Sequence, residues 1–290
     1  MNKYIILIPL ILLIIYYFIH KLYIKYKINN YFKYNNPKCS IDINNPICKE
    51  FNNIENDYFD FASTEPYNIN NILYIIKLIE QFLIYLKTDY ENNKLNINNL
   101  YDQKLIKSNY NKIPVGISYS NKDKTSVFFI FRGSLTNKEV IKYVSFKKNP
   151  NRSSHKYYTL IYNDIKQQLL DCLYLNTKNI YICGYSMGAC IGYIMANDMD
   201  IKYNINVIGI GAAKTVTNEF ADSLKSKCKY LLNVVNLADI VTTISMPNFT
   251  KFKQITPKLT FNKFNKSILD THNLYSYYDG IKNEPVSFEK

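Results

Sequence analysis

The 290-residue sequence has no tryptophan, only eight glycines and three histidines, and two arginines among its 36 basic residues. None of its six cysteines forms a C-x-x-C pair, which argues against a zinc site. The chain also lacks zinc-finger spacing, a recognition-helix pattern and an RNA-binding signature, so nucleic-acid binding is not expected despite a formal net charge of +13. Because glycine is scarce, the position of each glycine carries more information than usual.

The basic charge has two explanations that the sequence leaves open. Asn, Ile, Lys and Tyr are abundant, a bias that AT-rich coding produces whatever the function. The other explanation is attraction to an anionic membrane surface.

The cysteines fall into two groups with different expected environments. Cys183 and Cys190 lie in apolar surroundings and are expected to be buried, whereas Cys39 and Cys48 would pair only in an oxidising compartment.

An uncharged apolar run lies near the N-terminus, over residues 4–20, between Lys3 and Lys21. As a helix rising ~1.5 Å per residue it reaches ~26 Å, slightly short of the ~30 Å hydrocarbon core, and the flanking lysines can snorkel. A cleaved signal peptide needs small residues near its cleavage site, and the first alanine is Ala62. We therefore expect an uncleaved single-pass transmembrane anchor within residues 1–28.

The remainder of the chain is expected to divide in two. Residues 29–60 are polar and Asn-rich and are expected to form a tether, and residues 61–290 are long enough for one domain with a substantial core. Lysines are more frequent after the apolar run than before it. The positive-inside rule therefore predicts that this domain lies on the cytosolic side of the membrane.

Hydrophobic periodicity predicts alternating helices and strands in this domain. Apolar residues recur at helical spacing over 69–86, and 157–174 is a second amphipathic segment. Two strands are predicted within 115–134, and strand-like runs follow at 180–183, 207–210 and 230–235. Strands that alternate with helices predict an α/β domain in which helices flank a mostly parallel central sheet.

One predicted strand leads directly into Gly184-Tyr185-Ser186-Met187-Gly188 and then into a predicted helix. A strand, G-x-S-x-G and a helix in this order present a nucleophilic serine on a sharp turn, where side chains larger than glycine would collide with neighbouring elements. The Met187 N–H at the start of the helix can then face a developing oxyanion. The alternative is a turn whose serine only caps the helix.

A nucleophilic serine needs a base and an orienting acid, and in this arrangement the acid and then the histidine follow the serine along the chain. Only His272 follows Ser186, because His20 and His155 precede it. The acids between them are Asp198, Asp200, Glu219, Asp222, Asp239 and Asp270. Asp239 comes just after an apolar, strand-like run, at the edge of the sheet where α/β sites assemble, and it is the predicted acid.

Several segments together resemble the class 3 (fungal-type) lipase family of the α/β-hydrolase superfamily. They are FFIFRGSLT, SSHKYYTLIYNDIKQQL, GYSMGA, VVNLADIVTTISMP and THNLYSYYDG, the last of which resembles a closing His-x-x-Tyr. The chain departs from the family pattern in three places. Tyr185 replaces a histidine, Lys156 and Tyr157 stand where the family has a residue and a glycine, and Thr242 replaces a proline.

The resemblance implies an α/β-hydrolase fold and a Ser186–His272–Asp239 triad that cleaves carboxylic ester bonds of lipids through an acyl-enzyme. It further implies that Ser134 and Met187 form the oxyanion hole, that His155 is structural, and that no metal or organic cofactor is needed. The expected partner is a lipid substrate at a membrane or lipid-droplet surface.

Three questions stay open at this point. The same site would serve an esterase or acyltransferase acting on a soluble substrate. A catalytically silent, membrane-tethered interaction module would have the same sequence features. Residues 135–154 follow the predicted oxyanion residue and are either a lid with an apolar face or an ordinary surface helix.

Overall fold

The structure is a computed structural model of the chain. It describes residues 50, 51, 54, 57, 59, 68–87, 94–97, 99–136, 138–140, 142, 153–243, 252–265 and 267–289. The predicted anchor at 1–28, Cys39 and Cys48, and most of segment 135–154 lie outside these residues. Within the described part of the chain, no helix is long and apolar enough to cross a bilayer.

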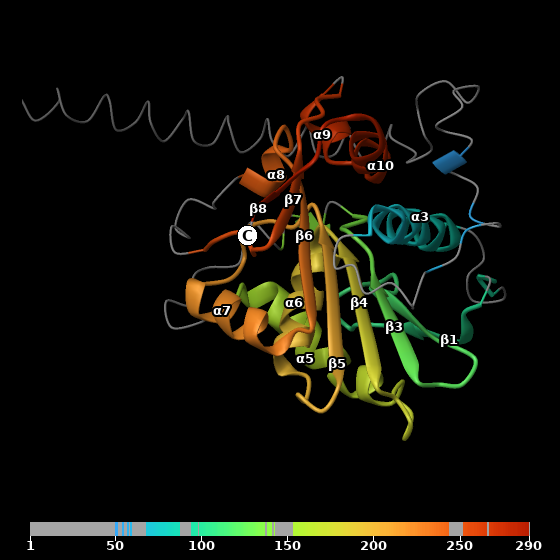
Figure 1. Cartoon of the computed structure of the whole chain (residues 1–290). Helices are drawn as coiled ribbons and strands as arrows, with labels where there is room; N and C mark the ends of the chain where they lie inside the picture. Colours follow the sequence, from blue (N-terminus) through green and yellow to red (C-terminus); the bar gives the residue numbers. More distant parts are fainter. Residues whose placement is uncertain are drawn as a thin grey trace, which may run out of the picture.

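The described strands form one eight-stranded sheet in which strand order follows the sequence (Figure 1). The strands are β1 (Tyr101–Ile106), β2 (Gly116–Ser120), β3 (Ser126–Phe131), β4 (Asn179–Tyr185), β5 (Asn204–Ile210), β6 (Tyr230–Asn236), β7 (Lys258–Phe261) and β8 (Ser287–Glu289). Strands β3 to β7 are parallel, and β1, β2 and β8 pair antiparallel at the two sides. The predicted α/β fold with a mostly parallel central sheet is confirmed.

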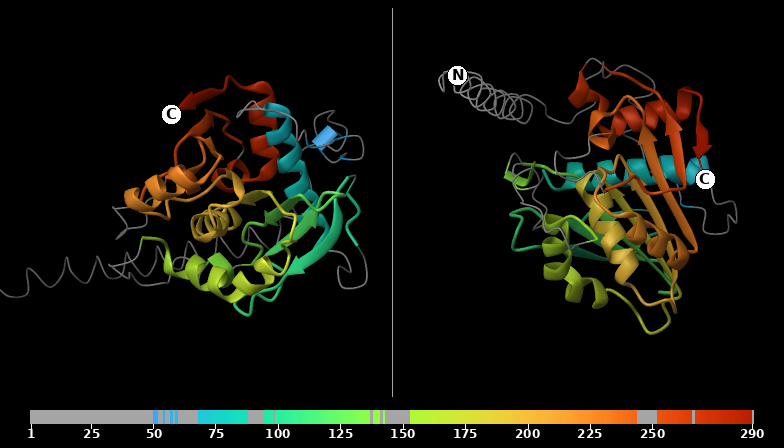
Figure 2. Two further views of the ribbon diagram at one scale, coloured as in Figure 1. Left: turned by 60° about the horizontal axis from the view of Figure 1, so that its bottom comes forward. Right: turned by 90° about the vertical axis from the view of Figure 1, so that its left-hand side faces the viewer.

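Helices cover both faces of this sheet, as the two views of Figure 2 show. One face carries α5 (Lys156–Leu170), α6 (Met187–Asp198) and α7 (Asn218–Lys227), and the other carries α3 (Ile69–Tyr85) and α10 (Leu274–Asn283). The short helices α8 (Ile240–Thr243) and α9 (Ile268–Thr271) lie near α10 at one end of the sheet (Figure 1).

The sheet divides the hydrophobic core into two halves, and side chains of β3 contribute to both. Phe128 and Ile130 point into the cluster beneath α3 and α10, whereas Val127, Phe129 and Phe131 point into the cluster beneath α5 and α6. Successive side chains of a strand face opposite sides of the sheet, so a strand covered on both faces is apolar at every position. All six β3 residues are buried, and all of them except Ser126 are apolar.

The predicted helices and strands are present, with boundaries shifted by a few residues. Helix α5 ends at Leu170 rather than at 174, and its N-cap is His155, whose ring nitrogen accepts from the Tyr157 N–H at 3.3 Å. Strands β1, β7 and β8 and helix α10 were not predicted. The sequence of β1, YDQKLI, is largely polar because five of its six residues are not fully buried at the sheet edge.

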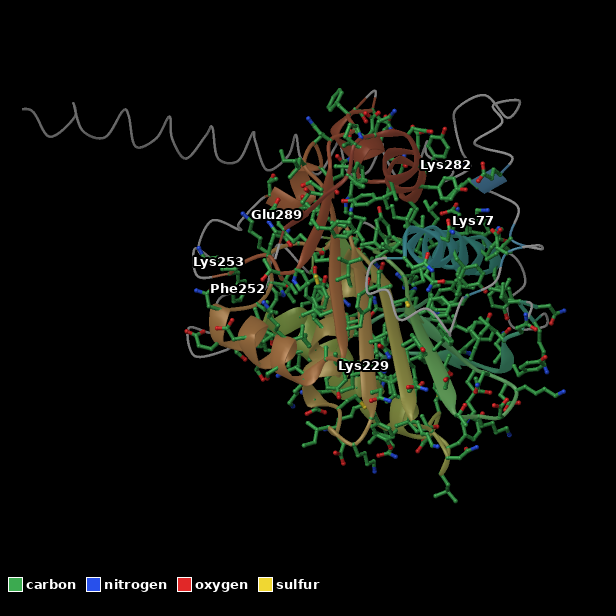
Figure 3. The ribbon with its side chains drawn as sticks, viewed as in Figure 1. Lys77, Lys229, Phe252, Lys253, Lys282 and Glu289 are labelled. Atoms are coloured by element: carbon green, nitrogen blue, oxygen red, sulfur yellow. The ribbon has the colours of Figure 1, made fainter. Side chains whose placement is uncertain are left out.

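Residues near position 50, within the range expected to be a tether, pack against the domain. Phe51 is 1% exposed and makes an edge-to-face contact with Tyr275, with ring centroids 5.8 Å apart. Lys77 on α3 and Lys282 on α10, both labelled in Figure 3, form ion pairs with Asp57 and Glu50. The described part of this segment is therefore attached to α3 and α10.

Candidate active site

Ser186 lies at the junction between β4 and α6, with φ 52° and ψ −117°. A positive φ is costly for a residue with a side chain, by about 1–3 kcal/mol, and persists only where the surroundings enforce it. Here the Ser186 N–H donates to the Ile210 carbonyl at 2.8 Å, which ties the turn to β5. The strained turn places the serine hydroxyl beyond the end of the sheet.

The two glycines around the serine are there because no side chain fits. A Cβ atom on Gly188 would lie 2.5 Å from the Phe131 carbonyl carbon, and one on Gly184 would lie 2.5 Å from the Gly188 carbonyl oxygen. Both obstacles are backbone, so neither can move aside as a side chain would. Close approach of α6 to β3 and β4 therefore requires both glycines.

The structure brings Ser186, His272 and Asp239 together. His272 Nε2 is 2.9 Å from Ser186 Oγ, and His272 Nδ1 is 2.5 Å from Asp239 Oδ2. Asp239 follows β6 directly and is fully buried, while His272 lies between α9 and α10 and is partly exposed. The three residues come from elements more than thirty positions apart in the chain, and they meet at one end of the sheet.

Asp239 has two further partners that hold its carboxylate. The Tyr277 hydroxyl donates to Oδ2 at 2.6 Å, and the Val241 N–H donates to Oδ1 at 2.9 Å. Burial, together with the adjacent Asp239 carboxylate, raises the pKa of Tyr277 well above its ordinary value, so the hydroxyl stays protonated and can donate.

Sequence reasoning missed Tyr277. The resembled His-x-x-Tyr ending points to Tyr275, which instead packs against Phe51. The signal that identifies Tyr277 is helical spacing, because Leu274, Tyr277 and Ile281 share the buried face of α10.

The predicted oxyanion residues lie side by side next to Ser186. Ser134 follows β3, and its hydroxyl donates to the Met187 sulfur at 3.7 Å. Among the described residues, neither the Ser134 N–H nor the Met187 N–H donates to another group of the protein. Both donors are therefore available to an oxygen atom bound beside Ser186.

A buried ion pair braces the loop that carries Ser134. Arg132 is fully buried, and its guanidinium donates to both carboxylate oxygens of Glu139, at 2.8 and 3.1 Å. Glu139 in turn accepts from the Leu135 and Thr136 N–H groups at 2.7 and 3.2 Å. Burial raises the pKa of Glu139, but the hydrogen bonds and charge of Arg132 outweigh it, so the pKa is lowered overall and the carboxylate stays charged.

Two of the other acids considered have partners outside the triad. Asp270 accepts from the Ser267 hydroxyl at 2.6 Å, and Asp198 pairs with Lys166 at 2.6 Å. Cys183 and Cys190 are buried, as expected for small apolar residues. Among the residues that the structure describes, no group of three His, Cys, Asp or Glu side chains is placed to hold a metal ion.

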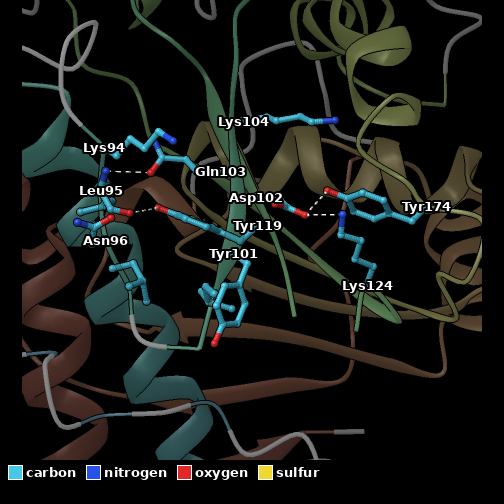
Figure 4. Close-up of a pocket in the computed structure, with 12 residues that line it drawn as sticks. Lys94, Leu95, Asn96, Tyr101, Asp102, Gln103, Lys104, Tyr119, Lys124 and Tyr174 are labelled. Atoms are coloured by element: carbon cyan, nitrogen blue, oxygen red, sulfur yellow. Dashed lines mark hydrogen bonds and ion pairs between the residues drawn. The ribbon is translucent and has the colours of Figure 1, made fainter. Parts of the chain in front are cut away.

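A separate hollow of about 740 Å³ lies at the edge of the sheet, by β1 (Figure 4). Its polar wall includes Asp102, which accepts from the Tyr174 hydroxyl at 3.0 Å and pairs with Lys124 at 3.1 Å. None of the residues that line it belongs to the Ser186 site. Asp102 and Lys124 in its wall are thus paired with each other.

Comparison with known proteins finds similarity to lipases in both sequence and fold. Residues 128–249 match the family model described as lipase (class 3). The triacylglyceride lipase of Rhizomucor miehei superposes with a TM-score of 0.52 at 18% identity, covering 69% of this chain and 82% of that one. A mutant form of a protein from Penicillium cyclopium gives 0.51 at 13% identity, covering 69% and 83%. A search of curated proteins finds no match.

The sheet, the serine turn and the histidine and aspartate beside it define the chain as an α/β-hydrolase. The matched segment, residues 128–249, is similar to the class 3 lipase family, and the protein is a carboxylic ester hydrolase. The family resemblance seen in the sequence is confirmed.

Proposed function

We propose that the protein is a membrane-anchored serine hydrolase that cleaves ester bonds of lipids, with Ser186, His272 and Asp239 as its catalytic triad. The observation that carries the proposal is the pair of distances through His272, 2.9 Å to Ser186 Oγ and 2.5 Å to Asp239 Oδ2. A hydroxyl, an imidazole and a carboxylate in this order are the groups that activate serine for acyl transfer.

In the proposed mechanism, Ser186 Oγ attacks the ester carbonyl while His272 Nε2 takes the hydroxyl proton. Asp239 holds the imidazole so that Nδ1 carries its proton toward the carboxylate, and it stabilises the charged ring. His272 then gives the proton to the departing alcohol, which leaves an acyl-enzyme on Ser186. Water, activated by His272, releases the fatty acid and restores the serine.

The negative charge on the ester oxygen would be stabilised by the Ser134 and Met187 N–H groups. Their position next to Ser186 supports this role, as does the absence of any other acceptor for them among the described residues. Removing one such donor typically costs about 3–4 kcal/mol of transition-state stabilisation. The buried Arg132–Glu139 pair holds the loop in place before substrate arrives.

A lipid substrate is supported by exposed apolar side chains around Asp239. Leu237 is 53% exposed, Ile240 38% and Phe264 65%. The loops that carry them are joined, because the Leu237 N–H donates to the Phe261 carbonyl at 2.8 Å. Apolar side chains at the end of the sheet that bears the triad suit a site that works against an aggregated lipid surface.

The lipid class is part of the proposal. The Rhizomucor miehei neighbour is a triacylglyceride lipase, and we propose a triacylglycerol or a glycerophospholipid as the substrate of this chain. We further propose that residues 1–28 anchor the chain in a membrane and that the catalytic domain lies on the cytosolic side. Carbonate extraction of the full chain, with a chain lacking residues 1–28 as control, tests the anchor.

The substrate class is tested with the full chain in detergent micelles. Hydrolysis of emulsified long-chain triacylglycerol and of phospholipid vesicles is compared with that of a dissolved short-chain ester, with Ser186→Ala as the control. Faster turnover of the aggregated lipids, abolished in Ser186→Ala, is the expected result. A preference for the dissolved ester would favour the soluble-substrate esterase, and no turnover by a folded chain would favour the silent interaction module.

A further inference from the structure

Tyr185, which precedes the nucleophile, contacts three parts of the site at once. It stands where the resembled family has a histidine, and no role is assigned to it by the triad or the oxyanion donors. Its ring centroid is 5.2 Å from that of His272, and the planes are inclined by 29°. The two rings are therefore stacked beside the serine.

The Tyr185 hydroxyl also donates a hydrogen bond to the backbone carbonyl of His272. His272 lies in the short connection between α9 and α10, so its position depends on contacts with other elements. The hydroxyl fixes the backbone of this connection, and the stacked ring limits rotation of the imidazole. Both contacts start from the residue next to Ser186, and they therefore set the position of the base relative to the nucleophile.

The Tyr185 ring also lies against the oxyanion loop and against Tyr277, the residue that holds the Asp239 carboxylate. A Cβ atom on Gly133 would be 2.8 Å from Tyr185 Cδ1, so the ring packs on the backbone immediately before Ser134. Tyr277, whose hydroxyl holds Asp239, meets the Tyr185 ring edge to face at 6.5 Å. Tyr185 thus contacts His272, the backbone before Ser134, and Tyr277, which holds Asp239.

We propose that Tyr185 is a positioning residue, which holds His272 at proton-transfer distance from Ser186 and spaces the Ser134 loop from the nucleophile. This inference rests on the proposed function, since it assigns a role within the same triad. A histidine at this position has a shorter side chain than tyrosine and would not reach the His272 carbonyl while stacked on its ring. The connection before α10 is therefore held here by a contact that requires the tyrosine hydroxyl.

The test is steady-state kinetics of the full chain on an ester substrate, with kcat and KM measured separately. Tyr185→Phe keeps the stacked ring and loses the hydroxyl, and we expect kcat to fall about 10-fold with KM unchanged, because misplacing a catalytic group by a fraction of an ångström slows chemistry more than binding. Tyr185→Leu loses the ring contacts as well, and kcat should fall about 100-fold. Tyr185→His should behave like Tyr185→Phe.

The control is Tyr181→Phe. Tyr181 lies on the same strand and in the same half of the core, but it stacks on Phe128 rather than on His272, so this variant should leave kcat and KM unchanged. Thermal unfolding of every variant shows that each is folded. Wild-type kcat in Tyr185→Phe and Tyr185→His, or a change confined to KM, would overturn the positioning role while leaving the triad intact. A wild-type chain that turns over no ester would instead refute the proposed function, and this inference with it.

Discussion

At the scale of single residues, the hydrogen bonds around Asp239 determine how well the carboxylate can hold His272. The Tyr277 hydroxyl shares Oδ2 with the imidazole, and the Val241 N–H occupies Oδ1. Besides the imidazole, the two donors to the carboxylate lie at fixed positions in α8 and α10. The orientation of the carboxylate is thus set by the protein before the base is needed.

Tyr277→Phe removes one of these donors, and the side chain loses only its hydroxyl oxygen. We expect kcat to fall about 10-fold, because the Val241 N–H still orients Asp239 but Oδ2 gains freedom, and stability to fall by about 1 kcal/mol for the lost hydrogen bond. Ester hydrolysis and urea unfolding measure the two effects. An unchanged kcat would show that Tyr277 serves packing alone.

The Arg132–Glu139 pair gives a second prediction. Arg132→Met leaves the Glu139 carboxylate buried without its main partner, and we expect stability to fall by about 3–5 kcal/mol. Adding Glu139→Gln removes the unpaired charge, so the double variant should be more stable than Arg132→Met alone. Activity should stay low in both, because the loop with Ser134 has lost its brace. Urea unfolding that is equal for the single and double variants would contradict this.

Which of these residues could be predicted depends on how local their roles are. Ser186 was predictable because two scarce glycines flank it, and His272 because it is the only histidine that follows. Asp239 was predictable from its place after an apolar strand. Helical spacing places Tyr277 on the buried face of α10, but the partners of Tyr277, Tyr185 and Arg132 depend on which chain segments meet in three dimensions, and the sequence does not record that.

At the scale of elements, helix α6 must approach the sheet closely for Ser186 to reach its position. Gly188→Ala would place a methyl group 2.5 Å from the Phe131 backbone, and we expect a loss of more than about 3 kcal/mol or a chain that does not fold. Gly192→Ala on the same helix is the matched control, since its added carbon meets a side-chain methyl of Ile182 at 2.9 Å. Thermal unfolding should rank Gly188→Ala far below Gly192→Ala, and equal effects would argue against backbone contact as the reason for Gly188.

Helix α3 contains a buried acid that makes stability depend on pH. Burial raises the pKa of Glu80 from its ordinary value of 4.5 to about 7. Between these values the folded chain binds a proton that the unfolded chain has released, so the free energy of unfolding falls as pH rises from 4.5 to about 7. Glu80→Gln removes this dependence. The difference in unfolding free energy between Glu80→Gln and the wild type should therefore shift in favour of the variant by about 2–3 kcal/mol when the pH is raised from 5 to 8.

Urea unfolding of both chains at the two pH values measures this shift. A difference between Glu80→Gln and wild type that is the same at pH 5 and pH 8 would show that the carboxyl group does not change its protonation in this window.

Elements with strong periodicity were predictable, and the others were not. The apolar runs of β3 to β6 and the helical spacing of α3 and α5 are properties of local sequence. Strand β7 has only four residues, and β1 is largely polar because it lies at the sheet edge. Helix α10 is rich in tyrosine and contains Gly280, so its helical pattern was weak. These elements form because the rest of the sheet and α3 provide surfaces for them to cover.

At the scale of the whole molecule, sequential strand order gathers the site at one end of the sheet. The turn after β4 supplies Ser186, the loop after β6 supplies Asp239, and the connection before α10 supplies His272. Glu50 and Phe51 contact side chains of α10, so the described residues closest to the predicted anchor are attached to the helix that carries Tyr277.

The measurement that most directly tests the activated serine is fluorophosphonate labelling of the full chain in detergent micelles, with the modified peptide mapped by mass spectrometry. The triad predicts a single adduct on Ser186 that disappears in His272→Ala, because the hydroxyl reacts only when a base takes its proton. A folded wild-type chain without an adduct on Ser186, or one labelled equally in His272→Ala, would contradict the proposal that Ser186, His272 and Asp239 act as one catalytic unit.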